Sequence, residues 1–72
     1  MTTRILVVED DQNTRQLVKR YLEQAGFEVA EAAHGRAALE MMSLFSPALV
    51  VLDVILPDLD GRDLCRQISR RL

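Results

Sequence analysis

The sequence predicts an α/β domain in which three parallel strands form a sheet and three helices cover it. Two apolar runs, 5–8 and 48–52, lack alternation of apolar and polar residues, which is typical of strands buried in a parallel sheet. Segments with helical spacing of apolar residues follow the predicted strands, so the element order is βαβαβα. This order favours a parallel sheet with right-handed crossover connections.

The first half of the chain contains two strands and one helix. A strand over 4–8 leads into a helix that starts between residues 11 and 14, with Asp11 as its N-cap. Gly26 ends this helix in a left-handed conformation. Residues 27–31 alternate apolar and polar side chains, which predicts a half-exposed edge strand. The helix has one apolar stripe, made of Leu17, Val18, Tyr21, Leu22 and Ala25.

The second half adds two helices around the second apolar strand. Gly35 opens a helix that ends at 46–47, because the residue before a proline disfavours helical dihedral angles. The strand over 48–52 and a turn-rich loop over 56–61 precede a third helix that starts near Asp60 or Gly61. We expect core positions at Met41, Met42, Leu64, Cys65, Ile68 and Leu72, and a solvated helix end at Arg66, Arg70 and Arg71.

Length and composition limit what this chain can be. Its 72 residues allow one small domain, near the lower limit for a self-sufficient core. A net charge of −2 is too small to indicate a polyanion or membrane partner, so we expect no direct nucleic-acid contact. The single cysteine, Cys65, fits a reducing compartment. The longest apolar run, about five residues, is far shorter than the roughly 20 of a membrane helix, and a cytoplasmic location is expected.

Acidic residues follow both apolar runs. Glu9, Asp10 and Asp11 come directly after the first run, and Asp53 comes directly after the second. If the two strands are parallel neighbours, their carboxyl ends bring these carboxylates into one crevice, where ligands bind in such sheets. Carboxylates that close repel one another unless a cation lies among them. The pattern predicts a divalent-metal site with one aspartate left for chemistry.

These residues carry a resemblance to a known family. The chain resembles the N-terminal βαβαβα part of a response-regulator receiver domain of two-component signalling, on the basis of residues 5–11, Arg15 and residues 49–61. The resemblance implies a truncated flavodoxin-like, doubly wound parallel sheet with strand order 2-1-3. On this basis residues 1–72 are a truncated receiver domain that lacks the last two βα units.

The resemblance also implies roles for individual residues. Asp53 matches the phosphoacceptor, which takes a phosphoryl group from a sensor histidine kinase. Glu9 and Asp10 match the acidic pair that binds Mg²⁺, and the backbone carbonyl of Ile55 matches the position that completes the metal ligands with Asp53. Pro57 and Gly61 match the turn that shapes the loop over the site. Phosphoryl transfer of this kind depends mostly on positioning and charge neutralisation, which suits a self-catalysed reaction rather than a classical enzyme.

The family pattern is incomplete in this chain. A receiver domain resembles a five-stranded unit whose later strands carry a Ser or Thr and a Lys that contact the phosphoryl group, and no residue here matches them. Lys19 is predicted on the exposed face of the first helix. The outer edge of the third strand would be bare, and an unpaired apolar edge pairs readily with another chain. We therefore expect a homodimer through this edge, or a domain swap, and impaired switching.

Two other functions compete with this interpretation. The chain could be an oligomerising half-domain without signalling activity, in which the acids are vestigial. A Mg²⁺-dependent phosphohydrolase with an aspartyl nucleophile is disfavoured, because Ile55 stands where such enzymes carry a second aspartate. His34, in the loop before the second helix, is expected to be an exposed polar residue rather than a metal ligand or phosphodonor. Asp11 is expected to serve as an N-cap rather than as a metal ligand.

Overall fold

A computed structural model describes residues 2–52, 58 and 60–71. All six predicted elements are present, and the strand boundaries and helix starts lie within two residues of the predicted ones. The prediction of a βαβαβα order is therefore confirmed. In chain order the elements are β1 Arg4–Val8, α1 Gln12–Gln24, β2 Glu28–Ala32, α2 Gly35–Leu44, β3 Leu49–Leu52 and α3 Gly61–Ser69. Leu72, expected in the core on the third helix, lies outside the described residues.

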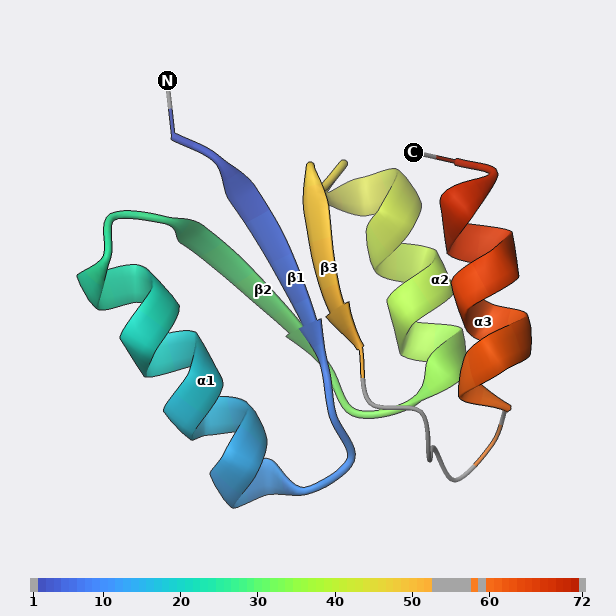
Figure 1. The fold of residues 1–72 in the computed structure, drawn as a ribbon, viewed down its shortest axis with the longest axis horizontal. Helices are drawn as coiled ribbons and strands as arrows, with labels where there is room; N and C mark the ends of the chain where they lie inside the picture. The colour runs from blue at the N-terminus through green and yellow to red at the C-terminus, as the bar shows by residue number, and fades with distance from the viewer. Residues whose placement is uncertain (1, 53–57, 59, 72) are drawn as a thin grey trace.

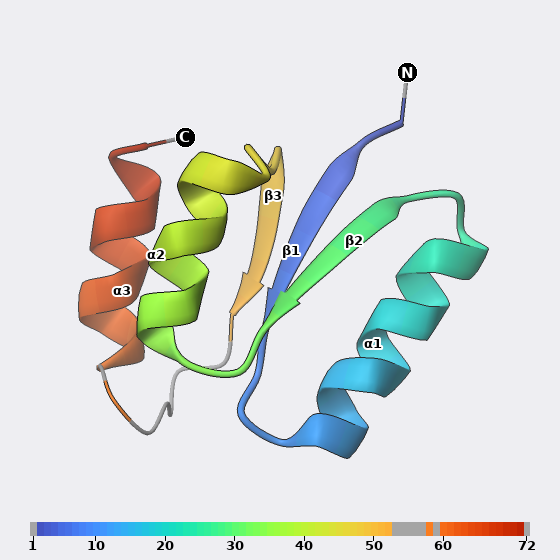
Figure 2. The same cartoon turned by 180° about the vertical axis from the view of Figure 1, so that it is seen from behind.

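The three strands form one parallel sheet in the order β2-β1-β3, as predicted. The register pairs Val8 of β1 with Ala32 of β2 on one side and with Leu52 of β3 on the other. Helix α1 covers one face of the sheet, and α2 and α3 cover the other (Figures 1 and 2). This is a doubly wound arrangement, and it brings the carboxyl ends of β1 and β3 level with each other.

The hydrophobic core lies between the sheet and the helices α2 and α3. Leu6 and Val8 of the central strand are buried there. Burial of one such aliphatic side chain stabilises the fold by about 1.5–3 kcal/mol. Ile5 and Val7 point to the opposite face, because side chains alternate along a strand, and they are equally buried. The core side chains that pack against Leu6 and Val8 are Ala32, Ala38, Met42, Leu64 and Ile68.

The ends of the helices follow the predicted chemistry. Asp11 is the N-cap of α1, and Asp60 is the N-cap of α3. Gly26 follows the C-cap of α1 with φ +97°, in the left-handed region that glycine adopts without a steric penalty. Helix α2 ends at Leu44, one residue before its C-cap and two before Ser46, which has φ +50°. Chain direction therefore changes just before Pro47 and β3.

The expected burial of Cys65 is wrong. Cys65 is exposed, whereas its neighbour Leu64 and the residue one turn later, Ile68, are buried. The reason is geometric: Leu64 and Ile68, four apart, lie on one face of α3, and that face supplies the contact with the core. Cys65 lies about 100° further round the helix and lines a shallow hollow beside β3.

The side of the molecule that carries α1 is only partly covered. No residue of α1 is buried, and Leu17 and Tyr21 of its predicted apolar stripe are 51% and 66% exposed. Leu49 and Val51 of β3 are 53% and 39% exposed. They share a sheet face with Ile5 and Val7, their partners in register, and α1 packs against β2 and β1.

Among the described residues, no helix is long and apolar enough to cross a membrane.

Candidate functional site

The candidate site begins where β1 ends. The backbone N–H of Glu9 donates to the carbonyl of Ala32 at 3.1 Å, which extends the contact with β2 one residue beyond β1. The side chain of Glu9 turns back and accepts a hydrogen bond from the N–H of Asp11 at 3.1 Å. Its carbonyl oxygen accepts a hydrogen bond from Nη1 of Arg15 at 2.9 Å. Glu9 is thus held by backbone and side chain together.

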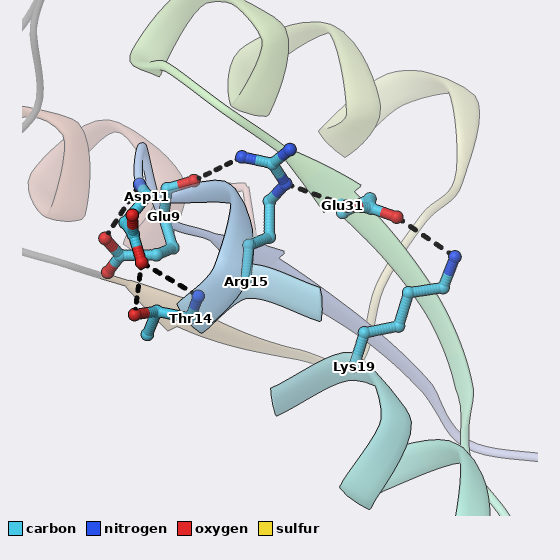
Figure 3. A network of polar contacts seen from close by, with 6 residues as sticks. All are labelled: Glu9, Asp11, Thr14, Arg15, Lys19 and Glu31. Carbon is cyan, nitrogen blue, oxygen red and sulfur yellow. Dashed lines mark hydrogen bonds and ion pairs between the residues drawn. The ribbon is translucent and has the colours of Figure 1, made fainter. Parts of the chain in front are cut away.

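Arg15 connects this strand end to β2 through a network of charged side chains (Figure 3). Its Nε donates to Glu31 Oε1 at 2.8 Å, and Lys19 Nζ donates to Glu31 Oε2 at 3.0 Å. The hydrogen bonds from Arg15 and Lys19 hold the pKa of Glu31 below its ordinary value. The hydrogen bond with Glu31 raises the pKa of Lys19. Lys19, predicted on an exposed helix face, is engaged in this ion pair.

Asp11 acts as the helix cap that the sequence predicts. Its Oδ2 accepts hydrogen bonds from the N–H and the hydroxyl of Thr14, at 2.9 and 2.6 Å. These two bonds, the hydroxyl bond first, lower the pKa of the Asp11 carboxyl. The interpretation of Asp11 as an N-cap is confirmed, and its carboxylate is directed at α1 (Figure 3).

Asp10 differs from its neighbours. It is exposed, and no hydrogen bond to its carboxylate occurs among the described residues. The remaining predicted site residues Asp53 and Ile55, with Pro57 of the loop, lie outside the described residues. Within the described part of the chain, no three His, Cys, Asp or Glu side chains gather into a metal-binding group. The structure therefore brings Glu9 and Asp10 to the strand end, and the roles of Asp53 and Ile55 stay predictions.

A second polar cluster, which the sequence did not indicate, lies at the start of α2. Asp58 accepts hydrogen bonds from the backbone N–H groups of Gly35 at 2.7 Å and Arg36 at 3.0 Å. The bond from Gly35 is the main reason that the pKa of Asp58 is lowered. Asp58 is 23 positions away from Gly35, so no local spacing could have revealed the contact.

His34 completes this cluster as the N-cap of α2. It is exposed, as expected. Its Nδ1 accepts a hydrogen bond from the N–H of Ala37 at 3.2 Å and lies 3.4 Å from Oδ2 of Asp58. The imidazole therefore lies beside both the first turn of α2 and the carboxylate of Asp58. Because the preferred N-cap residues are Ser, Thr, Asp and Asn, no sequence signal indicated this cap.

Nearly the whole chain matches one family of proteins. The model of the response regulator receiver domain matches residues 5–72. Response regulator MprA of Mycolicibacterium vanbaalenii is 46% identical over 68 residues, which cover 94% of this chain and 29% of MprA. The alkaline phosphatase synthesis transcriptional regulatory protein PhoP of Bacillus subtilis is 39% identical over 71 residues, covering 99% of this chain and 30% of PhoP. The chain thus spans less than a third of either relative.

Solved structures agree with the fold. A CheY-like response regulator receiver domain from Methanospirillum hungatei superposes with a TM-score of 0.94 at 31% identity, covering 97% of this chain and 56% of that one. The chemotaxis protein CheY4 of Vibrio cholerae gives a TM-score of 0.92 at 30% identity, covering 99% and 59%. The predicted flavodoxin-like strand order is the order of these domains.

Proposed function

The chain belongs to the response regulator receiver domain family, and on that premise we propose that it is a phosphoacceptor module that takes a phosphoryl group on Asp53 from a sensor histidine kinase, with Mg²⁺. The observation that carries the proposal is the register of β1 and β3. Val8 and Leu52 are partners, so β1 and β3, each of which is followed by acids in the sequence, end at the same edge of the sheet.

The residues at this edge suit a hard divalent cation. Mg²⁺ prefers oxygen ligands and keeps several of its waters, so a few carboxylates and one carbonyl are enough. Asp10 is exposed, and Glu9 is fixed at the strand end by its backbone. On this proposal Glu9, Asp10 and Asp53 hold the ion with the carbonyl of Ile55. When bound, the ion neutralises charge on the phosphoryl oxygens and offsets repulsion among the carboxylates.

The proposed transfer needs little chemistry from the protein. A carboxylate oxygen of Asp53, ionised at neutral pH, attacks the phosphorus of a phosphohistidine. A P–O bond forms to Asp53 as the P–N bond breaks, and the histidine nitrogen leaves with the electron pair. The contribution of this chain is to place the nucleophile and the acidic pair together.

A magnesium titration followed by ¹H–¹⁵N NMR tests the site. We expect saturable shifts of the Glu9 and Asp10 amides. The Asp53→Asn variant should bind Mg²⁺ more weakly and keep the oligomeric state of the wild type. Asp63→Asn is the matched control, because Asp63 is an exposed acid of α3 whose partner is Arg66. Absence of any Mg²⁺-dependent shift in the wild type would contradict the proposal.

This chain by itself should respond weakly once phosphorylated. The resemblance expects a hydroxyl side chain and a lysine against the phosphoryl group, and none of the 72 residues matches them. The lysine of this chain, Lys19, is paired with Glu31. Beryllofluoride, which mimics a bound phosphoryl group, should therefore shift amides near the strand ends and leave those of α2 and α3 unchanged.

A second copy of the chain is the partner that β3 fits best. In the described part of the chain, β3 pairs along one edge, with β1, and its Leu49 and Val51 are exposed. An apolar strand with a free edge pairs with another strand, and a two-fold axis makes that pairing symmetric. We propose a homodimer through β3 or a domain swap. The same observation favours the alternative of a non-signalling assembly unit, which the Asp53→Asn titration separates from the receiver function.

A further inference from the structure

We infer that Arg15 is a positioning residue for the acidic pair, because its guanidinium holds the carbonyl of Glu9 while Glu31 holds the guanidinium. The inference rests on the proposed Mg²⁺ site. It concerns a side chain of α1 that acts through the backbone carbonyl of Glu9, directly after β1.

The geometry of Arg15 supports this role. Its side chain is only 14% exposed, and two different nitrogens of the planar group make its two contacts. Nη1 reaches the Glu9 carbonyl at 2.9 Å, and Nε reaches Glu31 Oε1 at 2.8 Å. Figure 3 shows the guanidinium lying between these two partners. A rigid fork that is fixed by one partner presents its other nitrogen in a defined direction.

The orientation of the Glu9 carbonyl affects the position of the next acid, Asp10. The peptide bond between Glu9 and Asp10 is planar, so the direction of this carbonyl also sets where the Cα of Asp10 lies. On the other side, the Glu9 N–H is bonded to the Ala32 carbonyl. Together these contacts fix the peptides on both sides of Glu9. Arg15 therefore determines the position of Asp10 relative to Glu9.

Substitution of Lys19 is the control for the loss of a positive charge near the site. Lys19 carries the same charge as Arg15 and contacts the same acid, Glu31, but among the described residues it makes no hydrogen bond to Glu9 (Figure 3). Removing a positive charge near a cation site strengthens cation binding through Coulomb interaction. Removing a positioning contact weakens it. The two effects have opposite signs, so charge and positioning can be separated by comparing variants at 15 and 19.

The experiment is a Mg²⁺ titration of the wild-type chain and of Arg15→Met, Arg15→Lys and Lys19→Met, with the Glu9 and Asp10 amides as the NMR readout. Phosphorylation is not required. Loss of a residue that orients metal ligands typically weakens metal binding by about 10–100-fold, and we expect Arg15→Met to raise the Mg²⁺ Kd by at least about tenfold. Lys19→Met should leave the Kd unchanged or lower it. Arg15→Lys keeps the charge but lacks the fork, so it should also bind weakly.

The outcomes distinguish this inference from the proposed function. If the wild type binds no Mg²⁺, the proposed site fails and the inference fails with it. If the wild type binds and a folded Arg15→Met chain binds as tightly or more tightly, the inference alone is overturned. Arg15→Lys with wild-type affinity would show that charge suffices and would also overturn it. If Arg15→Met does not fold, the Lys variant decides.

Discussion

Asp58 accepts a hydrogen bond from the backbone N–H of Gly35 at 2.7 Å, across 23 positions of the chain. The helices α1 and α3 are capped by the residues directly before them, Asp11 and Asp60. Helix α2 has a local cap, His34, and also this remote carboxylate. A negative charge at a helix N-terminus is favourable because it satisfies free N–H groups and opposes the helix dipole. The contact ties the segment before α3 to the start of α2.

The Asp58→Ala variant should therefore be less stable than the wild type. Loss of the carboxylate leaves the backbone N–H groups of Gly35 and Arg36 without this acceptor. Asp58→Asn, which keeps one acceptor oxygen, should lie between the two. Urea unfolding followed by circular dichroism measures this order. Asp63→Asn, an exposed acid paired with Arg66 on α3, should unfold like the wild type, and equal midpoints for all four chains would argue against the contact.

Acid should destabilise the fold through Glu31. Arg15 and Lys19 hold its folded pKa below the ordinary value, so its contribution is complete above about pH 4.3 and is lost as the pH falls through the lower folded pKa. The pKa values of Asp11 and Asp58 are lowered as well, which adds to the effect in the same direction. Urea midpoints over a pH series measure the slope. Glu31→Gln should be less stable at neutral pH and lose less stability on acidification; an unchanged slope would contradict the ion-pair network.

Neighbouring positions of α3 should differ sharply in their tolerance of substitution. Leu64 is completely buried, and Leu64→Ala should cost about 2–5 kcal/mol through lost burial and the cavity left behind. Cys65 is exposed, and Cys65→Ser should change stability by less than about 0.5 kcal/mol. The free energy of unfolding in urea tests both. A large effect at Cys65 would restore the sequence-based expectation that this cysteine belongs to the core.

Charge on the free edge of β3 should abolish self-association. We expect the chain to sediment as a dimer at micromolar concentration, and Val51→Lys to sediment as a monomer, because an edge lysine opposes strand pairing. Leu44→Lys is the control, since Leu44 is a 78% exposed apolar residue at the end of α2. A wild-type chain that melts cooperatively as a monomer would contradict the dimer. A dimer that survives the Val51 substitution would contradict pairing through the edge of β3 and leave the domain swap.

Local patterns were enough to predict the elements of this fold. The unbroken apolar run of β1, the N-cap Asp11 and the left-handed Gly26 each act over a few residues, and all three are confirmed. The burial of Cys65 was wrong because hydrophobicity places a residue on an apolar stripe but does not say how wide the packed face of a helix is. That width depends on the neighbouring helix and strand.

The polar contacts were predicted less well, because most of them connect distant segments. The bonds from Arg15 of α1 reach Glu9, directly after β1, and Glu31 of β2. The contact of Asp58 with the start of α2 spans α2 and β3. Spacing along one segment contains no information on such contacts. The position of Glu9 and Asp10 was predicted from the acidic residues that directly follow an apolar run. In the structure the two residues directly follow β1, as expected.

On the proposed function, Asp53 accepts a phosphoryl group with Mg²⁺. Intact-mass spectrometry after incubation with acetyl phosphate tests it most directly, with the wild-type chain compared with Asp53→Asn and Asp63→Asn. We predict one added phosphoryl group on the wild type and on Asp63→Asn, lost when EDTA removes the Mg²⁺, and none on Asp53→Asn. An unmodified wild-type chain, or equal modification of Asp53→Asn, would contradict phosphorylation of Asp53.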